Sequence, residues 1–154
     1  MSDSIQSDFT IIVKSKEFKV HKPILSARSP VFKKMFETNM KEAEDNKVEI
    51  NDIDPLVFEQ LLIFIYSGST ENLNYFAMDL FAAADKVCLS NHIIFRFVTI
   101  LNLQYGIDEL KKICENYIST ELNYGNLNEI DVFKFANLYS CHELKEKALR
   151  LIKE

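Results

Sequence analysis

Apolar and polar residues alternate along the first part of the chain. Apolar side chains occupy every second position on either side of a short polar stretch: Phe9, Ile11, Val13, Phe18 and Val20. Alternation with a period of two predicts β-strands that bury one face. The polar stretch at Ser15 and Lys16 separates the two runs, so we expect a β-hairpin that turns there.

The next segment, "VHKPILSARSPVFKKMF", has the apolar spacing of a helix but contains two prolines, Pro23 and Pro30. Proline fits the first turn of a helix, because the N–H that it lacks has no partner there. The residue before a proline avoids the helical conformation, so Ser29 should end one helix and cap the next. The pattern therefore predicts two short helices that meet at a sharp corner.

Helical patterns dominate the rest of the chain. A short strand is expected at 48–50, and then Asp54–Pro55 and Ser67–Gly68 have the residue types that begin and end a helix. Four further helical segments are predicted, at residues 74–86, 106–118, 129–140 and 142–154. Two or three early strands followed by helices predict an α+β fold, and 154 residues suffice for one domain with a helical appendage.

Composition excludes several classes of function. The net charge is -5, and the longest basic runs are pairs of lysines, which argues against nucleic acid as a partner. The three cysteines are far apart and form no CxxC motif, so we expect neither disulfides nor a metal site, and a reduced intracellular compartment. The N-terminus has no secretory signal, and no segment is suited to crossing a membrane.

Motifs for catalysis are also missing. With three glycines in the chain, no phosphate-binding loop can be written, and no serine lies in a GxSxG motif. Cys114 falls on the apolar stripe of its predicted helix, which favours a buried thiol over a nucleophile. We therefore expect no enzyme activity, no catalytic residue, no cofactor and no small-molecule substrate.

Two residues near the corner of the first helices allow more than one interpretation. His21 stands where the second strand meets the first helix, so its ring either makes a local hydrogen bond or acts as a pH switch. Arg28 is either an ordinary surface cation or a side chain that stacks or pairs at an interface.

The run "SDFTIIV…EFKVHKPILSARSPVFKKMFETNMKEAEDNKVEINDIDPLVFEQLLIFIYSG" resembles a BTB/POZ domain, and most of all that of the speckle-type POZ proteins. The resemblance covers residues 7–86 and resumes at Tyr105. It implies a BTB/POZ fold, a short mixed β-sheet clustered with α-helices, over residues 7–118. Residues 119–154 resemble the helix pair that begins a BACK-like extension.

The resemblance also implies a function. Such domains dimerise through their first helices, and this subfamily recruits cullin-3 as an adaptor of a ubiquitin ligase in the nucleus or cytoplasm. The cullin contact of the family, an apolar residue, any residue and then glutamate, matches Met40 and Glu42. The dimer interface would centre on Ile24, with these residues nearby: Asp8, Phe9, Leu25 and Arg28. Only seven residues precede Asp8, where the family often has another helix, so we expect a weaker dimer.

The adaptor would dimerise with itself or with related BTB proteins. One alternative is a regulator that only pairs with full-length relatives, without recruiting a cullin. Another concerns the block Val87 to Gln104, which interrupts the resemblance and has one formal charge in 18 residues, against 27% charged residues in the chain. Valine codons begin with GT and glutamine can be encoded by CAG, so this block could be a retained intron and the chain a non-functional product. A genuine apolar insertion that covers the core or binds a partner is the competing interpretation.

Overall fold

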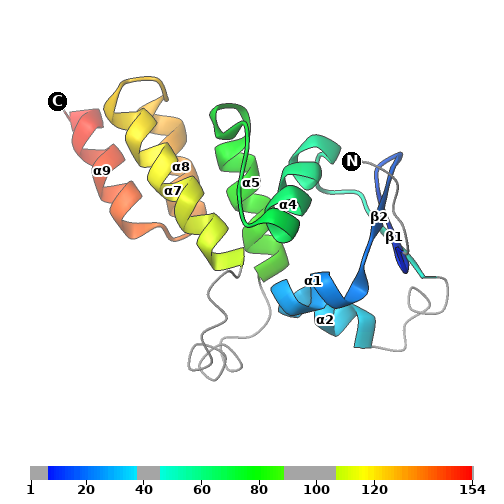
Figure 1. The fold of residues 1–154 in the computed structure, drawn as a ribbon. Coiled ribbons are helices and arrows are strands. Elements are labelled where there is room, and N and C mark those ends of the chain that lie inside the picture. Colours follow the sequence, from blue (N-terminus) through cyan, green and yellow to red (C-terminus); the bar gives the residue numbers. More distant parts are fainter. Residues whose placement is uncertain (1–6, 38–45, 89–106, 154) are drawn as a thin grey trace.

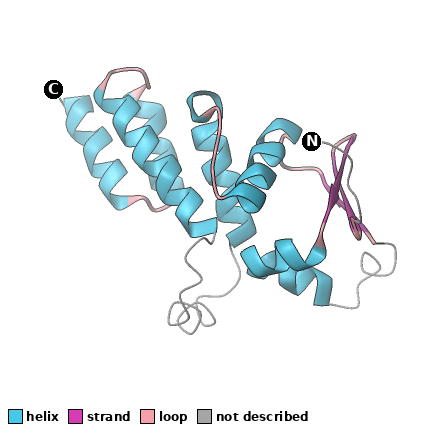
Figure 2. Cartoon of the chain, in the orientation of Figure 1, coloured by secondary structure: helices cyan, strands magenta, loops and turns pink. Residues whose placement is uncertain are grey.

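The computed structural model describes residues 7–37, 46–88 and 107–153. Its strands are β1 (Phe9–Val13), β2 (Lys16–Val20) and β3 (Lys47–Ile50), and its helices are α1 (Lys22–Arg28), α2 (Pro30–Glu37), α4 (Pro55–Ser67), α5 (Leu73–Cys88), α7 (Ile107–Asn123), α8 (Glu129–Leu138) and α9 (His142–Lys153). The sheet lies at one end of the molecule, and helices form the remainder (Figures 1 and 2). This arrangement confirms the predicted α+β class.

The sheet is mixed, with β1 in the centre. β2 pairs antiparallel with β1, so that Ile11 lies opposite Phe18, and β3 pairs with β1 in parallel. The apolar positions of the predicted hairpin are all buried, with exposed fractions of 7% or less. Lys14 in the turn has a positive φ of 55°, as a tight connection between the two strands requires. The predicted hairpin and the short third strand are therefore confirmed.

Ser29 separates α1 from α2, as the two prolines predict. Its extended backbone ends α1, and its hydroxyl oxygen accepts a hydrogen bond of 3.2 Å from the N–H of Phe32 in the first turn of α2. The same hydroxyl donates to the backbone carbonyl of Val87 at 3.0 Å. One buried side chain thus joins the corner of the first two helices to the end of α5.

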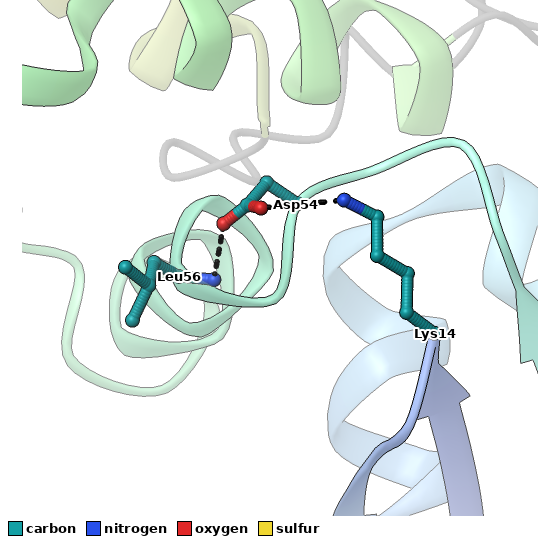
Figure 3. Close-up of polar contacts among 3 residues, drawn as sticks. All are labelled: Lys14, Asp54 and Leu56. Carbon is teal, nitrogen blue, oxygen red and sulfur yellow. Dashed lines mark hydrogen bonds and ion pairs between the residues drawn. The ribbon is translucent and has the colours of Figure 1, made fainter.

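Helix α4 begins and ends at the predicted residues. The side chain of Asp54 accepts a hydrogen bond of 2.9 Å from the N–H of Leu56 and forms an ion pair with Lys14 in the hairpin turn (Figure 3). Gly68 has a φ of 74°, the left-handed conformation that ends helices and that glycine adopts without strain. Buried side chains surround most of α4, so this helix forms the centre of the core between the sheet and α5.

Helices α5, α7, α8 and α9 continue away from the sheet, with α5 packed against α7 and α8 packed against α9 (Figure 1). The predicted apolar face of α7 is confirmed, because Ile107, Leu110, Cys114 and Ile118 are buried. The helix continues to Asn123, so the boundary that the sequence suggests between residues 118 and 119 falls inside α7.

The end of α5 differs from the prediction. The helix was expected over residues 74–86, but it extends to Cys88, and Val87 is 5% exposed. Burial of Val87 and the hydrogen bond from Ser29 to its carbonyl make this residue part of the core. The remainder of the atypical block, residues 89–104, lies outside the described residues.

Candidate protein interface

The start of α1 is held by a hydroxyl group from α4. The backbone N–H of His21 donates to the Tyr66 hydroxyl at 3.0 Å, and the His21 ring nitrogen Nδ1 lies 3.0 Å from the same oxygen. Burial raises the pKa of the Tyr66 hydroxyl, so this group stays protonated, and the tautomer of the His21 ring decides which of the two atoms donates in the second contact. Of the two interpretations of His21, the structure thus shows the local hydrogen bond.

A second contact holds α1 against β1. The carboxylate of Asp8 accepts a hydrogen bond of 2.7 Å from the backbone N–H of Lys22, in the first turn of the helix. An N–H at this position has no partner within the helix, and a carboxylate there also suits the helix dipole. The Lys22 ammonium lies over the Phe9 ring and donates to Asn46 before β3. These contacts orient α1 relative to the sheet.

The structure separates the predicted dimer residues into two groups. Phe9 and Leu25 are 3% and 0% exposed, so they support α1 from inside and present no surface to a partner. Ile24 is 37% exposed, Asp8 is exposed and Arg28 is half-buried in the last turn of α1. Of the predicted dimer residues, Asp8, Ile24 and Arg28 are therefore the ones with enough exposed surface to contact a second domain directly.

The predicted cullin contact, Met40 and Glu42, lies outside the described residues. It belongs to the connection between Glu37 at the end of α2 and Lys47 at the start of β3. The structure therefore describes the two elements that bracket the motif.

A groove of about 1060 Å³ lies between α7 and α9, with Phe81 of α5 and Tyr139 after α8 at its wall. Its rim carries both signs of charge, including Lys111, Glu115 and Glu146. Lys147 crosses from α9 to α7 and donates to the backbone carbonyl of Ser119 at 2.8 Å and to its hydroxyl at 2.6 Å. This bond between the two helices was not predicted, because a lysine and a serine 28 residues apart leave no signal in the sequence.

The described residues hold little that suits catalysis. Burial raises the pKa of Cys114 to about 12 and that of Cys141 to about 11, so both thiols stay protonated and unreactive at neutral pH. Within ranges 7–37, 46–88 and 107–153, no three histidine, cysteine or acidic side chains are grouped to hold a metal ion. None of the helices described there is long and apolar enough to cross a membrane.

Comparison with known proteins agrees with this architecture. The sequence model of the BTB/POZ domain matches residues 1–94, a range that includes the first residues of the atypical block. The BTB domain of human gigaxonin is 23% identical, with a TM-score of 0.54 over 72% of this chain and 76% of that chain. The BTB domain of zebrafish PATZ1 is 22% identical, with a TM-score of 0.54 over 74% and 76%.

These likenesses at low identity show the fold, and the family match covers more than half of the sequence. BTB domains are protein–protein interaction modules, and they generally dimerise with other BTB proteins. The structure contains a β-hairpin, a corner between α1 and α2 and a buried α4. Together with the match over residues 1–94, these features show that the chain belongs to the BTB/POZ domain family.

Proposed function

We propose that this chain is a dimerising adaptor for a cullin-3 type scaffold of a ubiquitin ligase, related to the speckle-type POZ proteins. The observation that carries the proposal is the presence of Met40 and Glu42, an apolar residue and a glutamate two positions apart, between α2 and β3 of a BTB domain. In the resemblance noted above, an apolar residue and a glutamate at this place contact the cullin.

The two residue types suit such a contact. A methionine side chain is long and flexible and fills an apolar pocket on a partner, and single anchors of this kind carry much of the energy of an interface. A carboxylate beside it accepts hydrogen bonds at the rim and fixes the orientation.

The packing of the C-terminal helices is a second observation that supports the proposal. We assign residues 7–118 to the BTB domain and residues 119–154 to a helical extension of the BACK type. Helices α8 and α9 pack together and join the domain through α7, which runs across the assigned boundary without a break. A partner that binds the BTB domain near α7 can therefore also meet the extension.

Calorimetry with the N-terminal fragment of cullin-3 tests the proposal. Wild type should bind, and Met40→Asp should lose at least about 2 kcal/mol of binding free energy, because a charge replaces the apolar anchor. Glu42→Ala should lose less. Lys41→Ala, at the position between them, is the matched control and should bind as wild type does.

Equal melting temperatures of the four proteins will show that the fold is intact. If wild type does not bind cullin-3, or if Met40→Asp binds equally well, the adaptor function is wrong. A wild type that pairs with other BTB domains but not with cullin-3 would instead support the regulator that acts by dimerisation alone.

A further inference from the structure

Strand β3 forms one edge of the three-stranded sheet. In the part of the chain that the structure describes, β3 pairs with β1 on one side and with no strand on the other. The sheet itself lies at the end of the molecule opposite to α8 and α9 (Figure 1). Backbone groups along such an edge are free to pair with a further strand.

The hydrogen bonds to β1 identify the groups of β3 that point away from the sheet. The carbonyls of Asn46 and Ile50 accept bonds of 2.9 and 3.1 Å from the chain of β1 and the turn after it. In a parallel pair, the backbone groups that face the neighbouring strand recur at every second residue. Those of Val48 therefore also face β1, and the N–H and C=O groups of Lys47 and Glu49 point outward.

Two side chains of opposite charge accompany these outward groups. Lys47 and Glu49 are both exposed, and they lie on one face of the strand because they are two residues apart. Among the described residues, neither side chain has a hydrogen-bond or ion-pair partner. A strand that pairs with β3 thus meets a cation and a carboxylate that no described group neutralises.

The opposite face of β3 is apolar and half-covered. Val48 lies beside Ile11 and Ile50 lies beside Val13, and both of these β1 residues are buried in the core. Val48 and Ile50 pack against the same core but remain half-exposed at the edge of the sheet. An apolar side chain on an added strand covers them and extends the core face of the sheet.

We propose that the edge of β3 binds an extended segment of another protein, which pairs antiparallel and has the order basic, β-branched apolar, acidic. The basic residue lies opposite Glu49, the apolar residue opposite Val48 and the acidic residue opposite Lys47. Opposite charges and β-branched pairs across strands stabilise a sheet, and antiparallel pairing is slightly more stable than parallel pairing. In strand addition of this kind, backbone hydrogen bonds supply affinity and alternate side chains supply specificity.

A flexible segment suits this edge better than a second copy of the chain does. The order Lys47, Val48, Glu49 is itself basic, apolar, acidic, so two copies would match in charge. Their pairing would, however, extend over the four residues of β3, whereas stable interfaces between folded proteins bury about 1,200 Å² or more. A flexible segment can continue past the strand and contact the surface around it.

Two capped peptides of equal composition test the order of charges. One has Lys-Val-Glu at its centre, the other has Glu-Val-Lys, and both have the same flanking threonines and a fluorescent label. By fluorescence anisotropy, wild type should bind the first peptide at least about threefold more tightly than the second. Lys47→Glu combined with Glu49→Lys exchanges the two charges at constant net charge and should reverse the preference.

Glu49→Pro tests the backbone contact. Proline removes the outward N–H but none of the groups that face β1, and edge strands accept proline at such positions. This variant should bind neither peptide and should melt near the temperature of wild type. Glu49→Ala is the matched control, which loses the charge but keeps the N–H, so it should bind the first peptide more weakly than wild type does. If Glu49→Pro unfolds, the charge-exchanged variant decides alone.

Three results would overturn the inference: no binding of either peptide to wild type, equal or inverted preference between the peptides, or unchanged binding to a folded Glu49→Pro. Self-association of wild type that Glu49→Pro abolishes, seen by sedimentation velocity without any peptide binding, would also overturn it and assign the edge to a second copy. The inference goes beyond the adaptor function, which the cullin-3 calorimetry decides separately through Met40.

Discussion

Ser29 shows how one small side chain connects distant parts of this fold. It is 1% exposed, and its hydroxyl accepts from the Phe32 N–H while it donates to the Val87 carbonyl, 58 residues away. Both partner residues are buried, Phe32 at 1% and Val87 at 5% exposed. The residue is therefore a cap for α2 and a link between α2 and α5.

Replacement of Ser29 by alanine should leave both groups without a partner. The expected loss is about 1 to 3 kcal/mol of the free energy of unfolding, the cost of a buried polar group left unsatisfied. Urea denaturation measures it, and Ser26→Ala on α1 is the matched control, which should change stability by less than about 0.5 kcal/mol. Equal midpoints for wild type and Ser29→Ala would mean that the hydroxyl contributes nothing.

Asp54 should make part of the stability depend on pH. The N–H of Leu56, together with Lys14, holds the pKa of the Asp54 carboxyl below its ordinary value of 3.8. A carboxylate with a lowered pKa in the folded state stabilises the protein above its unfolded pKa, and this contribution is lost as the pH falls through the folded pKa.

Asp54→Asn retains an oxygen that can cap α4 but loses the charge, whereas Asp54→Ala loses both. We expect melting temperatures at pH 7 in the order wild type, Asn variant, Ala variant, and a smaller gap between wild type and the Asn variant at pH 3 or below, because Asp54 is then increasingly protonated. An Asn variant as destabilised as the Ala variant would assign the effect to the ion pair with Lys14 instead of the cap.

At the scale of elements, α1 is held by groups that come from two other elements. Tyr66 of α4 binds His21, and Asp8 beside β1 binds the first turn of the helix. Because these contacts hold the N-terminus of α1 and the side chain of Leu25 is buried in the core, Ile24 is presented at a fixed position on the outer surface of the helix. A fixed position is what a specific contact with another domain requires.

Ile24→Lys should therefore weaken pairing without unfolding the domain. A charge at the centre of an interface is desolvated when the partner binds, so the dissociation constant should rise by about tenfold or more. Sedimentation velocity of the chain, alone and mixed with a partner BTB domain, measures it. Leu138→Lys on α8, where the side chain is 73% exposed, is the control and should pair as wild type does. Unchanged pairing by Ile24→Lys would place the interface elsewhere.

At the scale of the whole molecule, α5 and α7 pack along each other although the block that begins at Val87 separates them in sequence. The first residue of this block is in the core, while 89–104 lie outside the described residues. Two deletion variants can therefore be made, one without Val87 and one that keeps it. One joins Lys86 to Tyr105, as a retained intron implies, and the other joins Cys88 to Tyr105 and keeps Val87.

Both deletions shorten the connection, which saves about 0.6 kcal/mol of closure free energy for each halving of its length. Only the first also removes the buried Val87 side chain, a loss of about 1.5 kcal/mol. The variant that joins Cys88 to Tyr105 should therefore melt at or above the parent temperature, and the one that joins Lys86 to Tyr105 should melt lower. If both deletions unfold the domain, the block contributes to the core, and a genuine insertion is correct. If the variant that joins Lys86 to Tyr105 is the more stable of the two, Tyr105 takes the place of Val87 in the core. A retained intron predicts this result.

The candidate interface was only partly predictable. The resemblance places the proposed dimer surface on α1, where Ile24 is exposed. Phe9 is in the core, on the face of β1 that the alternating pattern already predicts to be buried, and Leu25 of α1 is in the core as well. An apolar residue on a short amphipathic helix can face either a partner or its own domain, and the sequence pattern is the same in both cases. The decision depends on how α1 is rotated, which Tyr66 and Asp8 determine from other parts of the chain.

The sequence by itself determined the local elements. Apolar periods of two and 3.6 residues, the prolines at 23 and 30, and the caps at Asp54 and Gly68 act within a few residues, so their effect can be predicted without the rest of the fold. Tertiary structure alone decided the parallel addition of β3 to β1, the bond from Ser29 to Val87, the end of α5 at Cys88 and which apolar side chains of α1 stay exposed. These features join residues that are distant in the chain, and their energies exist only once the core has brought the partners together.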